Sequence, residues 1–331
     1  MAHVGDCCAH SQGKAMIDVL ACARFVCDRS THVAIDTRAI LRLADKLLSL
    51  PVPSWDYVHH YYDGSEKTVS YLLLVDALNF CFFPEPRLIV IVDGVKLQGY
   101  FALASVLKEA FDGERPIDDF RHLAQIDEQD VRTLLRGAAG TGEIPLFDER
   151  VRILREIGQQ VVALYQGDPS RLVKEACGGA QRLVELLVRD FPSFRDEACY
   201  AGERVAFYKR AQIFVGDLFG SFQGRSYGSF RDIDRLTAFA DYKLPQVLRA
   251  ERVLQYCEEL EGRIERMEWI DAGSPEEVEI RAATIVAVEE LRQGLKRRGR
   301  NLFAFEVDWL LWHIAQSAKM PPHHRTLTTF Y

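Results

Sequence analysis

The sequence lacks the features that mark disulfide-rich, membrane-spanning and strongly basic proteins. Among its 331 residues are eight cysteines, but none form the CxxC pairs or regular spacing that a disulfide framework or a cysteine-rich zinc site would need. The strongly apolar runs at 71–75 and 88–92 are far shorter than the roughly 20 residues that span a bilayer. The 41 Lys and Arg are outnumbered by 48 Asp and Glu, so contact with a nucleic-acid backbone would require a local basic patch.

The cysteines that are present favour a reducing environment. Cys81, for example, lies between Phe80 and Phe82, where a reduced thiol behaves as a small apolar side chain. The N-terminus lacks the basic and then apolar order of a signal peptide. With 48% hydrophobic and 27% charged residues, the composition is typical of a folded globular protein. We therefore predict a soluble protein with a cytoplasmic location and no membrane partner.

The pattern of apolar and helix-breaking residues predicts a mainly α protein with a small β-hairpin. Asp36 and Thr37 precede apolar residues spaced at about 3.6, which indicates a capped helix. The β-rich residues 88–92, then Asp93 and Gly94, then residues 95–100 predict a hairpin. Further helices are predicted near 101–112, 116–124, 127–136, 147–166, 170–190, 193–199, 203–219, 233–239, 244–260, 275–298 and 303–317. Because no repeat or low-complexity linker occurs, we predict one globular unit over residues 1–331.

Asp308 is the most unusual charged residue in the sequence. It lies in the stretch 303–312, where large apolar residues flank it on both sides over two helical turns. In an apolar pocket its charge would be poorly solvated, which suits a group that meets a developing cation in a transition state. The alternative is a single carboxylate on the wet face of an amphipathic helix.

Other polar residues allow a structural and a functional interpretation. Lys209 and Arg210 could anchor a phosphate, although most such charge runs form a solvated helix face. Asp76 and Asn79 interrupt an apolar stretch over residues 68–83, and we expect them to bind buried backbone groups.

No metal site is predicted. The adjacent pairs His59-His60 and His323-His324 are the histidine clusters that invite one. However, adjacent residues on a regular element point in different directions, and no carboxylate lies nearby at a ligand spacing.

Several longer stretches match a known family. They are residues 75–82, 144–146 with 149–150, 194–198, 207–213, 239–246, 277–282, 307–312 and 324–331. Through them the chain resembles the queuosine salvage protein family, the queuosine 5'-phosphate N-glycosylase/hydrolases, over most of its length. Residues 1–22 lie outside this resemblance, and we expect them to be poorly ordered.

The resemblance implies a helical fold similar to helix-hairpin-helix DNA glycosylases, applied to a free nucleotide. The implied reaction is hydrolysis of the N-glycosidic bond of queuosine 5'-monophosphate, which releases queuine and ribose 5-phosphate, and queuine is then reused in tRNA modification. No cofactor, no metal and no stable nucleic-acid partner are expected. One alternative is a glycosylase-like module that binds tRNA or damaged DNA without hydrolysing a free nucleotide, and another is a catalytically silent scaffold.

The reaction that the resemblance implies assigns roles to acidic residues. Cleavage of a ribosyl C–N bond generates oxocarbenium character, and Asp308 is the candidate to stabilise it electrostatically or to trap it covalently. Queuine carries a secondary amine expected to be cationic, so carboxylates near the base would be useful. Asp232 and Asp234 are the candidates for that contact, with Phe230 as a stacking surface.

The 5'-phosphate requires cationic donors, and the candidates in the matched stretches are Lys209, Lys243 and Arg325. In the family, the region that corresponds to residues 55–60 also contributes a histidine to the base pocket. Between His59 and His60, we choose His60. His313 stands where an acidic residue is usual in the family, and we include it among the substrate-binding candidates.

Overall fold

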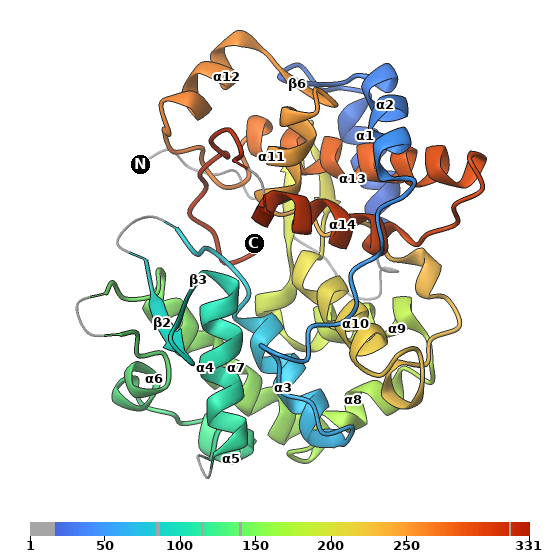
Figure 1. The fold of residues 1–331 in the computed structure, drawn as a ribbon. Coiled ribbons are helices and arrows are strands. Elements are labelled where there is room, and N and C mark those ends of the chain that lie inside the picture. Colours follow the sequence, from blue (N-terminus) through green and yellow to red (C-terminus); the bar gives the residue numbers. More distant parts are fainter. Residues whose placement is uncertain (1–16, 84–86, 114–115, 139–140, 318) are drawn as a thin grey trace.

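The computed structural model describes residues 17–83, 87–113, 116–138, 141–317 and 319–331, which form a mainly helical protein (Figure 1). The α-helices are α1 (Val19–Cys27), α2 (Thr37–Leu47), α3 (Glu66–Ala77), α4 (Tyr100–Asp112), α5 (Phe120–Leu123), α6 (Glu128–Leu134), α7 (Phe147–Tyr165), α8 (Ser170–Glu175), α9 (Ala180–Asp190), α10 (Lys209–Ser221), α11 (Lys243–Ala250), α12 (Glu258–Glu265), α13 (Pro275–Arg297) and α14 (Ala304–Ser317). The strands are β1 (Val33–Ile35), β2 (Ile89–Val92), β3 (Val95–Gln98), β4 (Glu197–Tyr200), β5 (Glu203–Ala206) and β6 (Leu254–Tyr256). Short 3₁₀ helices are η1 (Pro116–Asp118), η2 (Pro192–Phe194), η3 (Ser226–Gly228) and η4 (Ile233–Arg235).

The sheets of the described residues are small and antiparallel. They pair β1 with β6, β2 with β3, and β4 with β5. The hairpin β2–β3 is the predicted one, and its turn residues Asp93 and Gly94 have φ angles of 49° and 80°, as a two-residue turn requires. The prediction of a mainly α protein with a small hairpin is therefore confirmed.

Several predicted helix boundaries are wrong. At these positions the helical spacing of apolar residues continues along the sequence, but the chain itself turns. The expected helix over 193–199 is instead η2 and β4, and the one expected from residue 203 starts as β5. Between these strands Ala201 and Gly202 have φ angles of 50° and 83°, so the chain reverses.

Two predicted long helices are each divided. The helix expected over 170–190 breaks into α8 and α9 at Cys177 and Gly178, whose φ angles are 49° and 72°. The helix expected over 244–260 is divided into α11 and the start of α12. Helix α11 ends at Ala250, because Arg252 has a φ of 59° and the chain then enters β6.

The segments before α1 and after η4 also differ from expectation. Asp18 caps α1 by accepting a hydrogen bond from the Ala21 N–H, so the expected poor order of residues 1–22 is wrong for residues 17–22. Residues 1–16 lie outside the described residues. The helix expected over 233–239 shortens to η4. The backbone N–H of Phe239 donates to the carboxyl group of Asp308 instead of to a carbonyl oxygen within a helix.

Two large apolar clusters form most of the core, and a small third one consists of Phe83, Tyr242 and Tyr331. The larger one takes its residues mainly from α1 and α3–α10, and the smaller one from α2 and α11–α14. In Figure 1, α2 and α11–α14 lie in the upper half, while α3–α8 lie in the lower half. Helix α13 contributes to both clusters and packs against α1, α2 and α14. No helix in the described parts of the chain has the length and apolar character to cross a membrane.

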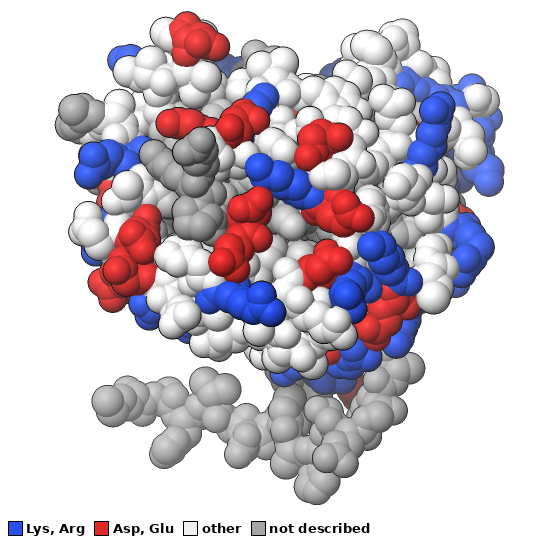
Figure 2. All heavy atoms as spheres, turned by 90° about the horizontal axis from the view of Figure 1, so that it is seen from below, with Lys and Arg blue, Asp and Glu red and all other residues white. Residues whose placement is uncertain are grey.

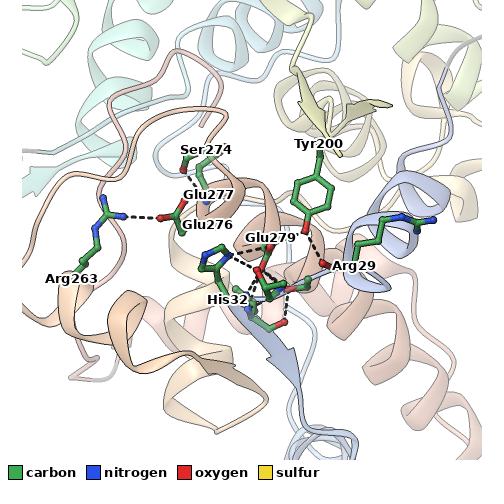
Figure 3. A network of polar contacts seen from close by, with 11 residues as sticks. Arg29, His32, Tyr200, Arg263, Ser274, Glu276, Glu277 and Glu279 are labelled. Carbon is green, nitrogen blue, oxygen red and sulfur yellow. Dashed lines mark hydrogen bonds and ion pairs between the residues drawn. The ribbon is translucent and has the colours of Figure 1, made fainter. Parts of the chain in front are cut away.

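A buried glutamate on α13 holds the loop between α1 and β1 (Figure 3). One oxygen of Glu279 accepts hydrogen bonds from the Ser30 hydroxyl at 2.6 Å and from the His32 N–H at 2.7 Å. The other oxygen accepts from the Tyr200 hydroxyl, on β4, at 2.8 Å. Burial alone would raise the pKa of Glu279, but these hydrogen bonds lower it below its ordinary value. Glu279 therefore links α13 to both β1 and β4.

Candidate active site

A cavity of about 360 Å³ lies where the two apolar clusters meet. Its lining residues come from the loop before α3, from the segment between α3 and β2, from β3 and the start of α4, from α10, from the segment that opens α11, from α14 and from the C-terminal segment. Cavities of this size suit drug-sized and nucleotide-sized ligands. Among the residues predicted from the sequence, it brings together His60, Lys209, Lys243, Asp308 and His313.

Asp308 is buried in the wall of this cavity. Only 3% of the residue is exposed, so the alternative of a carboxylate on a wet helix face is wrong. One carboxylate oxygen accepts a hydrogen bond from the Phe239 N–H at 2.7 Å. Burial raises the pKa of Asp308 well above its ordinary value, and the nearby Asp241 raises it further, while the Phe239 N–H and Lys209 act in the opposite direction. The environment of Asp308 therefore favours its protonated form.

Asp241 is a second carboxylate in the cavity wall. It caps α11 by accepting hydrogen bonds from the N–H groups of Lys243 at 2.7 Å and Leu244 at 3.0 Å. Burial raises the pKa of Asp241 above its ordinary value, and Lys209 and the two N–H groups offset only part of this rise. The pKa of Asp308 is raised further than that of Asp241, so Asp241 is the more readily ionised of the two carboxyl groups.

Lys209 is the ammonium group beside these carboxyl groups. It is 4% exposed, so the interpretation of Lys209 and Arg210 as a solvated helix face is wrong. Its Nζ donates to the backbone oxygen of Asn79 at 3.0 Å. Burial lowers the pKa of Lys209 to about 8, although the negative charge of Asp241 raises it. Lys209 is therefore still cationic at neutral pH and serves as a counterion of Asp241.

A buried ion pair positions Lys209 and Asp241. Arg281 on α13 forms two hydrogen bonds with the carboxylate of Asp196, at 2.7 and 2.6 Å. The same carboxylate accepts from the backbone N–H of Lys209 at 3.1 Å, where α10 begins. Arg281 Nε donates to the backbone oxygen of Ala240 at 3.1 Å, directly before Asp241. One charge pair thus fixes both chain segments that carry the central charges of the cavity.

One wall of the cavity is aromatic. His60 Nε2 lies 2.7 Å from the Tyr100 hydroxyl and its Nδ1 lies 2.8 Å from the backbone oxygen of Asp56. Its ring packs on Trp55 with centroids 4.7 Å apart. Burial lowers the pKa of His60 to about 4, so the ring is neutral. Phe101, Trp309 and Trp312 extend this wall, which suits a planar ligand.

Another part of the lining is basic. Arg87 and Lys243 both line the cavity. Burial lowers the pKa of Lys243, with the positive charge of Arg87 adding to this effect and Asp241 opposing it. His323 lies against the Tyr242 ring, with centroids 4.6 Å apart, and burial lowers its pKa to about 4. Two cations so close to a cavity favour an anionic ligand.

Four residues predicted to bind substrate do not line the cavity: Phe230, Asp232, Asp234 and Arg325. The carboxylate of Asp232 accepts from the N–H of Ala180 at 2.6 Å, which satisfies the N-terminus of α9. Asp234 is exposed to solvent in η4, and Phe230 packs against the larger apolar cluster. Arg325 lies 3.3 Å from the sulfur of Met267.

Comparison with known proteins identifies the family. The model of the queuosine salvage protein family matches residues 59–331. The chain belongs to this family. A relative from Sphaerobacter thermophilus, named queuosine 5'-phosphate N-glycosylase/hydrolase, is 47% identical over 95% of this chain and 98% of its own length. Relatives with the same name are 39% identical in Dictyostelium discoideum, over 81% of this chain and 79% of their own, and 35% identical in Mus musculus, over 93% and 97%.

The family match covers most of the cavity lining, including residues that the sequence analysis did not select. Asp241 lies within the matched stretch 239–246, and nothing in its local sequence distinguishes it from a helix-capping aspartate. Asp217 lies two turns after Lys209 on α10, so helical spacing from Lys209 could have found it. No signal in the sequence pointed to Arg87 or Tyr100, because they come from the loop before β2 and the start of α4.

Proposed function

We propose that this member of the queuosine salvage family is a hydrolase that cleaves the N-glycosidic bond of queuosine 5'-phosphate. The products would be queuine and ribose 5-phosphate, and queuine would be reused in tRNA modification. The names of the relatives support this substrate and reaction. The observation that carries the proposal is a single cavity that combines carboxyl groups, an aromatic wall and a pair of cations.

Asp308 and Asp241 are the proposed catalytic pair. The reaction needs negative charge near the sugar as the C–N bond breaks, and it needs a proton for the departing base. The ionised Asp241 supplies the charge, with its orientation fixed by two backbone N–H groups. The protonated Asp308 gives its proton to the departing base, a water molecule adds to C1′ of the ribose, and the proton that this water loses restores the acid. This division gives Asp308 a different role from the electrostatic stabilisation or covalent trapping expected from the sequence, because its burial favours the protonated form.

The groups proposed to bind the substrate fall into two sets, one for the base and one for the 5'-phosphate. The aromatic wall around His60 and Trp312 would hold the base, with His313 at its exposed edge. Lys243 and Arg87 would hold the 5'-phosphate. Lys209, first considered for the phosphate, is instead proposed to keep Asp241 ionised, because it lies beside that carboxylate.

Two further proposals concern the fold relationship, which the family resemblance implies, and the location, which the cysteines suggest. We propose that the helical architecture is related to that of helix-hairpin-helix DNA glycosylases, which cleave the same type of bond. We also propose a cytoplasmic location, in keeping with the free thiols of the described cysteines and with the reuse of queuine in tRNA. A nucleic-acid-binding role has less support, because acidic and basic side chains are interspersed on the face shown in Figure 2.

The decisive experiment is to incubate the pure protein with queuosine, its 5'-phosphate and guanosine 5'-phosphate, and to measure the free base by chromatography. We expect rapid release of queuine from queuosine 5'-phosphate and little guanine from guanosine 5'-phosphate. Comparable rates on both nucleotides would indicate a general nucleotide hydrolase. Absence of any released base, together with salt-sensitive tRNA binding, would favour the nucleic-acid-binding alternative.

A further inference from the structure

The buried polar groups beside the cavity differ in how far they are satisfied. Neither oxygen of Asp76, on α3, accepts a hydrogen bond from a donor among the described residues, so the expectation that it binds buried backbone groups is wrong. His60 is also buried, with 4% of the residue exposed, but both of its ring nitrogens have a partner. The two partners differ in kind, and this difference fixes the direction of both hydrogen bonds.

The partner of His60 Nδ1 is a group that cannot donate a hydrogen bond. Nδ1 lies 2.8 Å from the backbone oxygen of Asp56. A carbonyl oxygen has lone pairs but no proton, so Nδ1 must carry the hydrogen. In a neutral imidazole ring only one nitrogen is protonated. Nε2 is then an acceptor, and the Tyr100 hydroxyl, 2.7 Å away, must be the donor.

The surroundings of His60 favour this neutral ring. Burial lowers the pKa of His60 to about 4. The carboxylate of Asp56 is engaged elsewhere, because it lies 2.6 Å from His59 Nδ1 and accepts from the Val58 N–H at 2.9 Å. The ammonium group of Lys108 donates to the backbone oxygen of Val58 at 2.7 Å, so a cation already lies on this loop. A second positive charge on His60 is therefore disfavoured by its position as well as by its burial.

Tyr100 carries this polarity into the cavity. It is the first residue of α4 and lines the cavity. Its ring meets that of Trp312 edge to face, with centroids 6.3 Å apart, and Trp312 lies one turn after Asp308 on α14. Because the hydroxyl hydrogen is directed to His60, the oxygen has only lone pairs to offer a ligand. The aromatic wall thus includes an acceptor of fixed polarity close to the proposed acid.

We propose that Tyr100 is a specificity-determining residue whose oxygen accepts a hydrogen bond from an N–H group of the base, and that His60 is the positioning residue that keeps this oxygen an acceptor. The 7-deazaguanine ring of queuine carries N–H donors at N1 and at its 2-amino group. An adenine-like ring has a bare nitrogen at N1, so two acceptors would face each other and both would stay unpaired. The inference rests on the proposed function for the identity of the ligand.

The tautomer of His60 can be measured without any ligand. Long-range ¹H–¹⁵N spectra of protein labelled with ¹⁵N-histidine show which ring nitrogen carries the proton, and the signals lost in His60→Phe, or in His60→Leu if the first variant does not fold, are those of His60. At about pH 7 we expect a proton on Nδ1 and a bare Nε2. Tyr100→Phe should shift the Nε2 signal and leave the Nδ1 proton in place. A proton on Nε2, or an Nε2 signal that does not respond to Tyr100→Phe, would overturn the inference.

Binding of two free bases, 7-deazaguanine and 7-deazaadenine, tests the acceptor itself. Titration calorimetry should show that the wild type prefers 7-deazaguanine and that this preference falls about 10-fold in each of two variants for opposite reasons. Tyr100→Phe removes the acceptor, so 7-deazaguanine should bind more weakly. His60→Phe, or His60→Leu in its place, frees the Tyr100 hydroxyl to donate, so 7-deazaadenine should bind more tightly. Structural damage to the cavity would instead weaken both bases, and that result would overturn the inference.

Tyr57→Phe is the matched control. Tyr57 lies on the same loop as His60, and its hydroxyl donates to the backbone oxygen of Ser221 at 2.9 Å, but it does not line the cavity. Its variant should keep the base preference of the wild type, and an equal loss there would contradict the role of Tyr100. If the wild type releases no queuine from queuosine 5'-phosphate, the proposed function fails, while the spectra of His60 still decide the direction of its hydrogen bond with Tyr100.

Discussion

Asp308→Asn should abolish most of the activity while leaving the fold intact. The amide oxygen of asparagine can still accept the 2.7 Å hydrogen bond from the Phe239 N–H, and the side chain has nearly the same volume. The variant loses only the proton that Asp308 would donate. A positioned general acid contributes about 10²–10⁴-fold to the rate, which corresponds to about 2.7–5.5 kcal/mol of transition-state stabilisation. We therefore expect kcat for queuosine 5'-phosphate to fall by about that factor, as measured by queuine release.

The same variant should change how stability depends on pH. The pKa of Asp308 is raised in the folded protein, so the folded state holds a proton that the unfolded chain loses above about pH 4. Its contribution to the free energy of unfolding is greatest below that pH and declines as the pH rises toward the folded pKa. The slope is at most about 1.4 kcal/mol per pH unit. Asparagine does not titrate, so the stability of the variant relative to the wild type should increase from pH 5 to pH 8.

Glu306→Gln is the matched control for this prediction. Glu306 lies on the same helix and its carboxylate also accepts a backbone N–H, that of Phe303, at 2.8 Å. Burial also raises the pKa of Glu306, but the residue does not line the cavity. Steady-state kinetics should therefore show full activity in Glu306→Gln. Urea denaturation across pH measures the stability of both variants relative to the wild type. Near wild-type turnover in a folded Asp308→Asn protein would refute the catalytic assignment.

Three further predictions concern binding and stability. Lys243→Ala should raise KM for queuosine 5'-phosphate by about 10-fold or more, because it removes a charged hydrogen bond, and it should leave the nucleoside unaffected; equal losses on both substrates would exclude a phosphate contact. Asp196→Asn breaks a buried pair with Arg281 and should lower the free energy of unfolding by about 3–5 kcal/mol, measured by urea denaturation; a loss well under 1 kcal/mol would contradict this role. Asp232→Ala removes the acceptor of the Ala180 N–H and should cost about 0.5–2 kcal/mol of stability with kcat/KM unchanged, whereas a selective change in kcat/KM would return Asp232 to the base site.

The sequence by itself determined the features that depend on neighbours along the chain. Asp36 accepts from the N–H groups of Arg38 and Ala39, so the predicted helix cap is confirmed. The turn at Asp93 and Gly94 also forms where the residue types require it. Local propensity and spacing set these elements, because the atoms that interact lie within a few residues of each other. The resemblance to the queuosine salvage family likewise needed only short matched stretches, and the family match confirms it.

Tertiary structure alone decided which charges are buried and which carboxyl groups meet. Lys209 had the sequence pattern of a solvated charge, yet packing of α10 against α3 places it in the cavity. Asp232 was a candidate for binding the base because of the implied reaction, yet it satisfies the N-terminus of α9. Asp217 and Asp241 join Asp308 from two other segments of the chain. A pKa depends on burial and on charges within a few ångströms, and the chain sets those distances only when segments far apart in sequence pack together.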